Sequence, residues 1–170
     1  MNIFVLHRDP KIAAQMHIDK HVTKMSIEYA QLLSSAHHVW SSAENPALIG
    51  LYKPTHINHP ATKWARSHPS HYAWLYELAC ATWDEYTYRY GKIHASSRLR
   101  AQLAHIPDIN GGVATPPPQC MPDIHKVTGD SWDATIEGYR QYYQFVKVSF
   151  ATWKVRPSPE WWHPPTSMYV

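Results

Sequence analysis

The chain contains only two cysteines, Cys80 and Cys120, among its 170 residues. Two cysteines cannot form a disulfide framework or a thiolate metal site of the usual kind, so a reducing compartment is the simplest inference. The short apolar run near the start has no basic region before it, and it is too brief for a signal peptide or a membrane span. We therefore expect an intracellular protein without a membrane partner.

Several motifs of common enzymes are also missing. The sequence has neither a glycine-rich phosphate loop nor a G-x-S-x-G turn, so nucleoside triphosphate hydrolysis and serine hydrolysis have no support. Phenylalanine is scarce, with 3 residues against 11 tyrosines and 8 tryptophans. Tyrosine and tryptophan carry a polar tip on a flat apolar body, which suits stacking on bases as well as core packing. The net charge of +3 allows a polyanionic partner without requiring one.

Proline and glycine divide the chain into helical segments. Pro10 and Pro69 suit the first turn of a helix, and Gly91 suits the residue that ends one. We predict three long helices and two short ones, over residues 9–40, 69–90, 131–154, 60–67 and 96–104. Residues 2–6 are predicted to be extended, and the tail is too rich in proline for a helix. The sequence thus predicts an all-α fold in one compact domain, residues 1–170.

The first predicted helix carries polar and apolar residues on adjacent faces. At about 100° per residue, five side chains fall along one face, here called the polar stripe: His17, Lys20, His21, Lys24 and Glu28. The neighbouring face is apolar and is expected to face the core, through Ile18, Val22, Met25, Tyr29, Leu32, Leu33 and Ala36. A solvated surface with ordinary i,i+4 pairs is the alternative. We predict instead that the polar stripe lines a pocket, closed by the turn at Asn58-His59-Pro60 and by Arg89 and His94.

The polar stripe allows three kinds of chemistry. Its lysines can hold an anion such as phosphate while a carboxylate or imidazole moves a proton. A lysine can instead act as an amine nucleophile that forms a Schiff base. His17 and His21, four residues apart, can also meet one metal ion, with a third ligand from another histidine among His56, His59, His68, His71 and His94. Ile18 stands where the zincin motif has glutamate, and we expect no metal site.

The sequence resembles a family of small phage proteins over nearly its whole length. Residues 17–33 match the pattern H-x-D-K-H-V-x-K-M-x-x-E-x-x-Q-L-L, and the likeness continues through Asn58-His59-Pro60, the EYTYRYGK run at 85–92, Gln119-Cys120-Met121-Pro122 and the tail PEWW. It resembles the amino acid:DNA transferases of thymine hypermodification. The resemblance implies attachment of an amino acid amine to the methylene of a phosphorylated 5-hydroxymethyluracil in DNA, with loss of phosphate or pyrophosphate.

The implied reaction needs cations around the phosphate and a base for the incoming ammonium, and these needs assign roles to the candidate residues. Those expected to be catalytic are His17, Asp19, His21 and Glu28, and those expected to bind substrate or phosphate are Lys20, Lys24, Asn58, His59, Arg66, Arg89 and His94. No cofactor is expected. The implied partners are double-stranded DNA with a modified pyrimidine and a free amino acid, in the cytoplasm of an infected host cell. The target base would leave the stack and lie against tyrosine or tryptophan.

Two other functions stay open. The layout also looks distantly like the pyrimidine-dimer glycosylases, small all-α enzymes that use an N-terminal amine as nucleophile. Asn2 argues against that alternative, because methionine removal is not expected before asparagine. The other alternative is a DNA-binding phage protein without catalytic activity.

Overall fold

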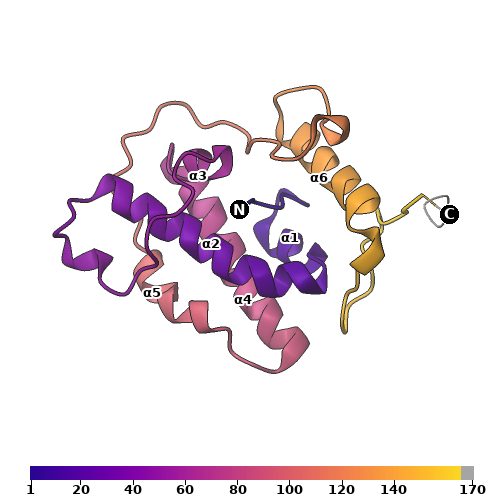
Figure 1. Cartoon of the computed structure of the whole chain (residues 1–170), viewed down its shortest axis with the longest axis horizontal. Coiled ribbons are helices and arrows are strands. Elements are labelled where there is room, and N and C mark those ends of the chain that lie inside the picture. The colour runs from indigo at the N-terminus through magenta and orange to yellow at the C-terminus, as the bar shows by residue number, and fades with distance from the viewer. Residues whose placement is uncertain (166–170) are drawn as a thin grey trace.

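The computed structural model describes residues 1–165, and every regular element in that range is a helix, which confirms the predicted all-α fold. Figure 1 shows α2 crossing in front of α4, with α6 to one side. No helix in the described range is long and apolar enough to cross a membrane. The α-helices are α1 (Pro10–Met16), α2 (Asp19–Trp40), α3 (Pro60–Ala65), α4 (Pro69–Tyr90), α5 (Arg100–Leu103) and α6 (Trp132–Val146), and the 3₁₀ helices are η1 (Pro46–Leu48), η2 (Ala95–Leu99), η3 (Asp123–His125) and η4 (Val148–Phe150).

The core lies between α2 and α4. The predicted apolar face of α2 is fully buried, and α4 contributes Tyr72, Leu75, Ala79 and Trp83 to the same cluster. The Trp83 indole donates to the Ser26 carbonyl oxygen at 2.9 Å, which joins the two helices through a buried hydrogen bond. The N-terminal segment passes through this core as an extended chain, with Ile3–Leu6 at most 6% exposed. Burial of these aliphatic and aromatic side chains supplies most of the driving force for the fold.

The prediction of one continuous helix from Asp9 to Trp40 is wrong. The chain leaves the helix at His17 and Ile18, both extended, and α2 starts at Asp19. Distant groups take the hydrogen bonds that a continuous helix would use. The Asp19 amide donates to the Thr152 carbonyl oxygen at 2.8 Å, and the Met16 carbonyl oxygen accepts from the Trp153 indole at 2.9 Å. The break therefore depends on the C-terminal segment, since no glycine or proline marks it.

The other predicted boundaries differ in accuracy. Helix α4 has the predicted bounds, and Gly91 ends it with φ of 63°, in the left-handed region that favours glycine. Helix α6 ends at Val146 rather than near residue 154. The predicted helix 96–104 is a 3₁₀ turn followed by the short α5. Beyond η4 the chain must turn back to place Thr152 against α2, which is incompatible with a longer α6.

Gly111 lies where the long 105–129 segment touches the junction of α3 and α4. A Cβ atom there would meet the Ser67 carbonyl oxygen at 1.8 Å, and this backbone cannot rotate away. We expect Gly111→Ala to lower the free energy of unfolding by about 3 kcal/mol, as overpacking against rigid neighbours does. Urea unfolding, followed by tryptophan fluorescence, measures this change in the free energy of unfolding.

Gly112 provides the matched control. A Cβ atom at this position meets nothing within 4 Å. Gly112→Ala should therefore change the free energy of unfolding by about 0.5 kcal/mol or less. Equal effects of the two substitutions would show that the contact with Ser67 is not what requires glycine at position 111.

Candidate functional site

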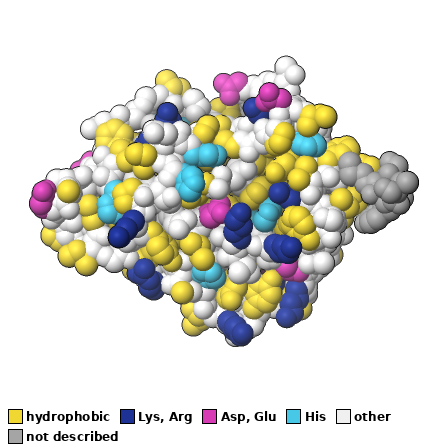
Figure 2. Space-filling model, viewed as in Figure 1, with side chains coloured by type: hydrophobic (Ala, Val, Ile, Leu, Met, Phe, Trp, Pro, Cys, Tyr) yellow, Lys and Arg dark blue, Asp and Glu magenta, His cyan; other side chains and the backbone are white. Residues whose placement is uncertain are grey.

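Glu28 is the centre of a small charged cluster on α2. Its carboxylate lies 3.6 Å from the α-ammonium of Met1 and 3.4 Å from the Lys24 ammonium. The Glu28 side chain is 14% exposed, whereas that of Lys24 is 65% exposed, so the carboxylate lies below a lysine that reaches solvent. Figure 2 shows histidine, basic and acidic side chains close together in the middle of the face that α2 crosses. A partly buried carboxylate between cations can accept a proton or hold an ammonium group.

The N-terminal segment is held in place at this cluster by its second residue. The Asn2 amide donates to the Cys120 carbonyl oxygen at 2.9 Å, and its oxygen accepts from the Tyr139 hydroxyl at 2.7 Å. These bonds come from a loop and from α6, and they leave the Met1 ammonium beside Glu28. Sequence reasoning missed Met1 as a site residue, because only the tertiary fold brings the terminus to α2.

The turn at Asn58-His59-Pro60 lies close to Glu28, while its closure of a pocket over the polar stripe stays a prediction. His59 caps α3, where its Nδ1 accepts from the Ala61 amide at 3.2 Å. The pKa of His59 is lowered by desolvation and by the positive charges of Met1 and His56, while Glu28 acts in the opposite direction. The Glu28 carboxylate is therefore close enough to the His59 ring to act on its pKa. Asn58 beside it is exposed.

His17 is part of the core, which corrects the expectation that it stands free to meet a ligand. The ring is fully buried, with Nδ1 2.6 Å from the Ala13 carbonyl oxygen and Nε2 2.6 Å from the Tyr29 hydroxyl. The Phe4 amide donates to the same hydroxyl at 3.2 Å, so the Tyr29 proton points to Nε2 and Nδ1 carries the imidazole proton. Both ring nitrogens are therefore occupied.

His21 is also mostly buried, under the surface of α2. It is 6% exposed, its Nδ1 lies 2.6 Å from the Tyr143 hydroxyl, and its ring stacks on Phe4 with a centroid distance of 4.1 Å. Burial, followed by the charges of His17, Lys147 and Lys24, lowers its pKa to about 2. A histidine with so low a pKa is uncharged near neutral pH, with one proton on its ring, and it is a weak acceptor for a second proton. It is therefore a weak candidate for general base compared with Glu28.

The buried histidines predict a loss of stability in mild acid. Burial lowers the pKa of His17 and of His37 to about 4 and that of His21 to about 2, below the ordinary value of 6.5. Between pH 6.5 and 5 the unfolded chain thus binds protons that the folded chain excludes. The free energy of unfolding should therefore decrease as the pH is lowered. The decrease is about 1.4 kcal/mol per pH unit for each histidine once the pH is well below 6.5.

Urea unfolding at pH 7, 6 and 5 tests this expectation. His37→Gln retains an amide that can bond to the Tyr72 hydroxyl, the partner of the His37 ring at 2.8 Å. In this variant the free energy of unfolding should depend less steeply on pH, by the contribution of one histidine. A free energy of unfolding that stays constant from pH 7 to 5 would contradict the prediction.

Asp19 and Arg89, two further candidates, bind each other inside a network of ion pairs. The Arg89 guanidinium, whose side chain is fully buried, lies 2.9 Å from Asp19 and 2.7 Å from Glu85. Asp19 also accepts from the Thr152 hydroxyl at 2.7 Å and from the Lys154 amide. Arg156 completes the network through two hydrogen bonds to Glu85. This geometry joins α2, α4 and the C-terminal segment, and it corrects the expectation that Arg89 turns toward the polar stripe.

The remaining candidates lie apart from one another. The Lys20 ammonium lies over the Phe150 ring, 4.4 Å from its centroid. His94 caps η2, where its Nδ1 accepts from the Ser96 amide at 3.1 Å. Arg66 is half-buried at the end of α3, and its Nη1 is buried without a hydrogen-bond partner. The structure thus brings Lys24, Glu28 and His59 together and leaves Arg66, Arg89 and His94 outside that group.

A cavity of about 510 Å³ lies elsewhere, between α1, α4 and Arg156. Its walls carry both signs of charge, from Lys11, Glu77, Asp84 and Arg100 among others, together with Tyr76 and Tyr88. None of its lining residues is among the candidates predicted from the sequence. The spacing of charges along α4 gives no signal for this cavity, since it depends on how α1 and the C-terminal segment cover the helix.

The two-histidine metal site is not formed. His17 and His21 bind different tyrosines, and across residues 1–165 no group of three His, Cys, Asp or Glu side chains is arranged to hold a metal ion. Comparison of the chain with protein-family models, with curated proteins and with solved structures found no match. The function must therefore be argued from the site itself and from the sequence pattern.

Proposed function

We propose that the protein is a DNA-modifying enzyme that transfers an amino acid to a phosphorylated 5-hydroxymethyluracil base. One observation carries the proposal: the Glu28 carboxylate already holds an α-ammonium, that of Met1, at 3.6 Å beside Lys24. An amino acid substrate presents the same group. Because each carboxylate oxygen accepts more than one hydrogen bond, Glu28 has capacity for a second ammonium. The sequence pattern supplies the identity of the reaction.

In this reaction the substrate ammonium first loses a proton to the Glu28 carboxylate. The freed amine nitrogen then forms a bond to the methylene carbon of the base. The bond between that carbon and the phosphate oxygen breaks, and phosphate or pyrophosphate leaves with the electron pair. Lys20 and Lys24, both exposed on α2, are the cations proposed to stabilise the charge on the leaving group.

The direct test is incubation of the protein with DNA that contains phosphorylated 5-hydroxymethyluracil and with each amino acid in turn. Mass spectrometry of the digested nucleosides should show a base that has gained the amino acid and lost its phosphate. DNA with unphosphorylated 5-hydroxymethyluracil is the control and should not react. No mass change with any amino acid would contradict the proposal. A DNA-binding protein without activity would instead bind the DNA without changing it. In that case Lys20→Ala should lower both the affinity for DNA and the dependence of that affinity on salt.

A glycosylase/lyase is the second candidate, favoured by the position of the Met1 amine. The Met1 α-ammonium lies 3.6 Å from the Glu28 carboxylate, and a primary amine is the nucleophile that such an enzyme uses. In that reaction the amine attacks C1′ of the sugar and the base leaves with the electron pair of the glycosidic bond. The sugar ring then opens at the C1′–O4′ bond, O4′ takes a proton from the nitrogen, and an imine forms between the amine nitrogen and C1′. Borohydride should then link the protein to DNA through Met1, as peptide mapping would show. An adduct at Met1 without transfer of an amino acid to the base would favour the lyase over the transferase.

A further inference from the structure

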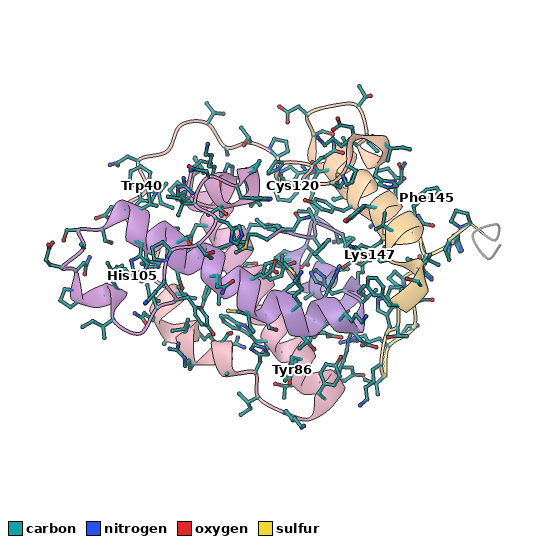
Figure 3. All side chains as sticks on the ribbon, viewed as in Figure 1. Trp40, Tyr86, His105, Cys120, Phe145 and Lys147 are labelled. Atoms are coloured by element: carbon teal, nitrogen blue, oxygen red, sulfur yellow. The ribbon has the colours of Figure 1, made fainter. Side chains whose placement is uncertain are left out.

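Aromatic rings and lysines alternate where α6 and η4 meet the start of α2. We call this the lysine–aromatic surface and define it as Lys20, His125, Tyr142, Phe145, Lys147 and Phe150. Contacts between rings and with a lysine connect its members in a row. The Phe145 ring stacks on His125 at 5.8 Å, His125 lies 5.6 Å from Tyr142, and the Lys147 ammonium lies 4.6 Å from the Tyr142 ring. Figure 3 labels Lys147 between α2 and the C-terminal end of α6, with Phe145 farther out along α6.

The two lysines of this surface approach one ring. The Phe150 centroid is 4.4 Å from the Lys20 ammonium and 5.9 Å from that of Lys147. No ion pair found in residues 1–165 includes either lysine. Two cations held near each other without a carboxylate repel, and an anion placed between them relieves this repulsion. The surface therefore suits a ligand with negative charges.

The rings remain partly accessible, although Tyr142 and Phe150 also pack against the core. Phe145 is 40% exposed, and His125, Tyr142 and Phe150 are half-buried. Exposed rings between unpaired lysines are the arrangement that binds single strands, because bases stack on rings while phosphates contact the cations. In a duplex the base faces are already stacked on one another, so these rings would have no partner.

We propose that the lysine–aromatic surface binds an unpaired, single-stranded stretch of DNA. The inference deepens the proposed function, on which it rests for the choice of nucleic acid, by stating the strand form that the protein contacts. The bases stack on Phe145, Tyr142 and Phe150, and the phosphates lie at Lys20 and Lys147. Opened DNA next to a base removed from the stack would present such a stretch.

Fluorescence anisotropy with a labelled 12-nucleotide strand and with its duplex tests the proposal over a series of salt concentrations. The strand should bind at least about 10-fold more tightly than the duplex. Phe145→Leu keeps an apolar side chain but removes the ring, and it should weaken strand binding by about 5-fold or more, since one stacked base contributes about 1–3 kcal/mol. Lys147→Ala should reduce the slope of log K against log salt by about 0.7.

Lys53→Ala is the matched control, because Lys53 is an exposed lysine outside this surface, in the loop between α2 and α3. It should leave strand affinity unchanged, and urea unfolding should show that Phe145→Leu is folded. Equal affinity for strand and duplex, or normal strand binding by Phe145→Leu, would overturn the proposal. So would binding to anionic lipid vesicles without binding to the strand.

The outcomes separate this proposal from the proposed function. If the protein modifies the base but Phe145→Leu and Lys147→Ala bind the strand normally, only the proposal for the lysine–aromatic surface is overturned. Strand binding with the expected losses, but without any base modification, would support the surface and contradict the transferase. The two experiments use the same full-length protein and the same DNA sequence.

Discussion

Glu28→Gln is expected to reduce the rate of amino acid transfer by about 10²–10⁴-fold, the contribution typical of a positioned general base. Glutamine has nearly the same shape as glutamate but cannot accept a proton at neutral pH. The fold should be retained, because the glutamine oxygen can still accept a hydrogen bond from the Met1 ammonium and the Lys24 side chain, which loses its ion pair, is 65% exposed. Single-turnover transfer assays with saturating DNA and amino acid measure the change.

Glu137→Gln is the matched control for this loss. Glu137 is exposed on α6, where its carboxylate accepts from the Gln141 side chain at 3.2 Å, and its replacement should leave the transfer rate unchanged. Full turnover by a folded Glu28→Gln protein would eliminate Glu28 as the base. Because the lyase candidate places its amine beside this carboxylate, the borohydride experiment, and not this substitution, separates the two reactions.

Glu85→Ala should lower the free energy of unfolding by about 3–5 kcal/mol, as removal of one partner from a buried ion pair does. Glu85 is 4% exposed and binds both Arg89 and Arg156. Burial acts to raise its pKa, but the hydrogen bonds from Arg156 and Arg89 outweigh burial and leave the pKa below its ordinary value. Loss of the carboxylate leaves the buried Arg89 with Asp19 as its remaining anion. The effect is a large share of the 5–15 kcal/mol typical of a domain.

Asp84→Ala is the control at the neighbouring position. Asp84 pairs with Arg100, but its side chain is 68% exposed, so water already solvates both charges. Its loss should change stability by about 1 kcal/mol or less. Urea unfolding at pH 7, followed by circular dichroism, compares the two variants. Similar effects would mean that burial does not control the strength of these pairs.

The sequence by itself determined the helical elements that local patterns specify. Helix α4 begins at Pro69 and ends before Gly91, as predicted, because proline suits the first turn and glycine tolerates a positive φ. The apolar face of α2 was also predictable, since apolar residues three and four apart must share a buried side. These features depend on neighbours in the chain, and such neighbours are visible in the sequence.

The tertiary structure alone decided where the polar residues of the first predicted helix lie. The break at His17 exists because the Asp19 amide and the Met16 carbonyl oxygen bond to residues more than a hundred positions away. It sends His17 into the core and pairs Asp19 with Arg89, whereas a continuous helix would have kept His17 on the polar stripe. The contact of the Met1 ammonium with Glu28 likewise needs the extended N-terminal segment to pass through the core. Hydrogen bonds and ion pairs between distant segments follow no periodic pattern in the sequence. Their partners are therefore known only from the folded structure.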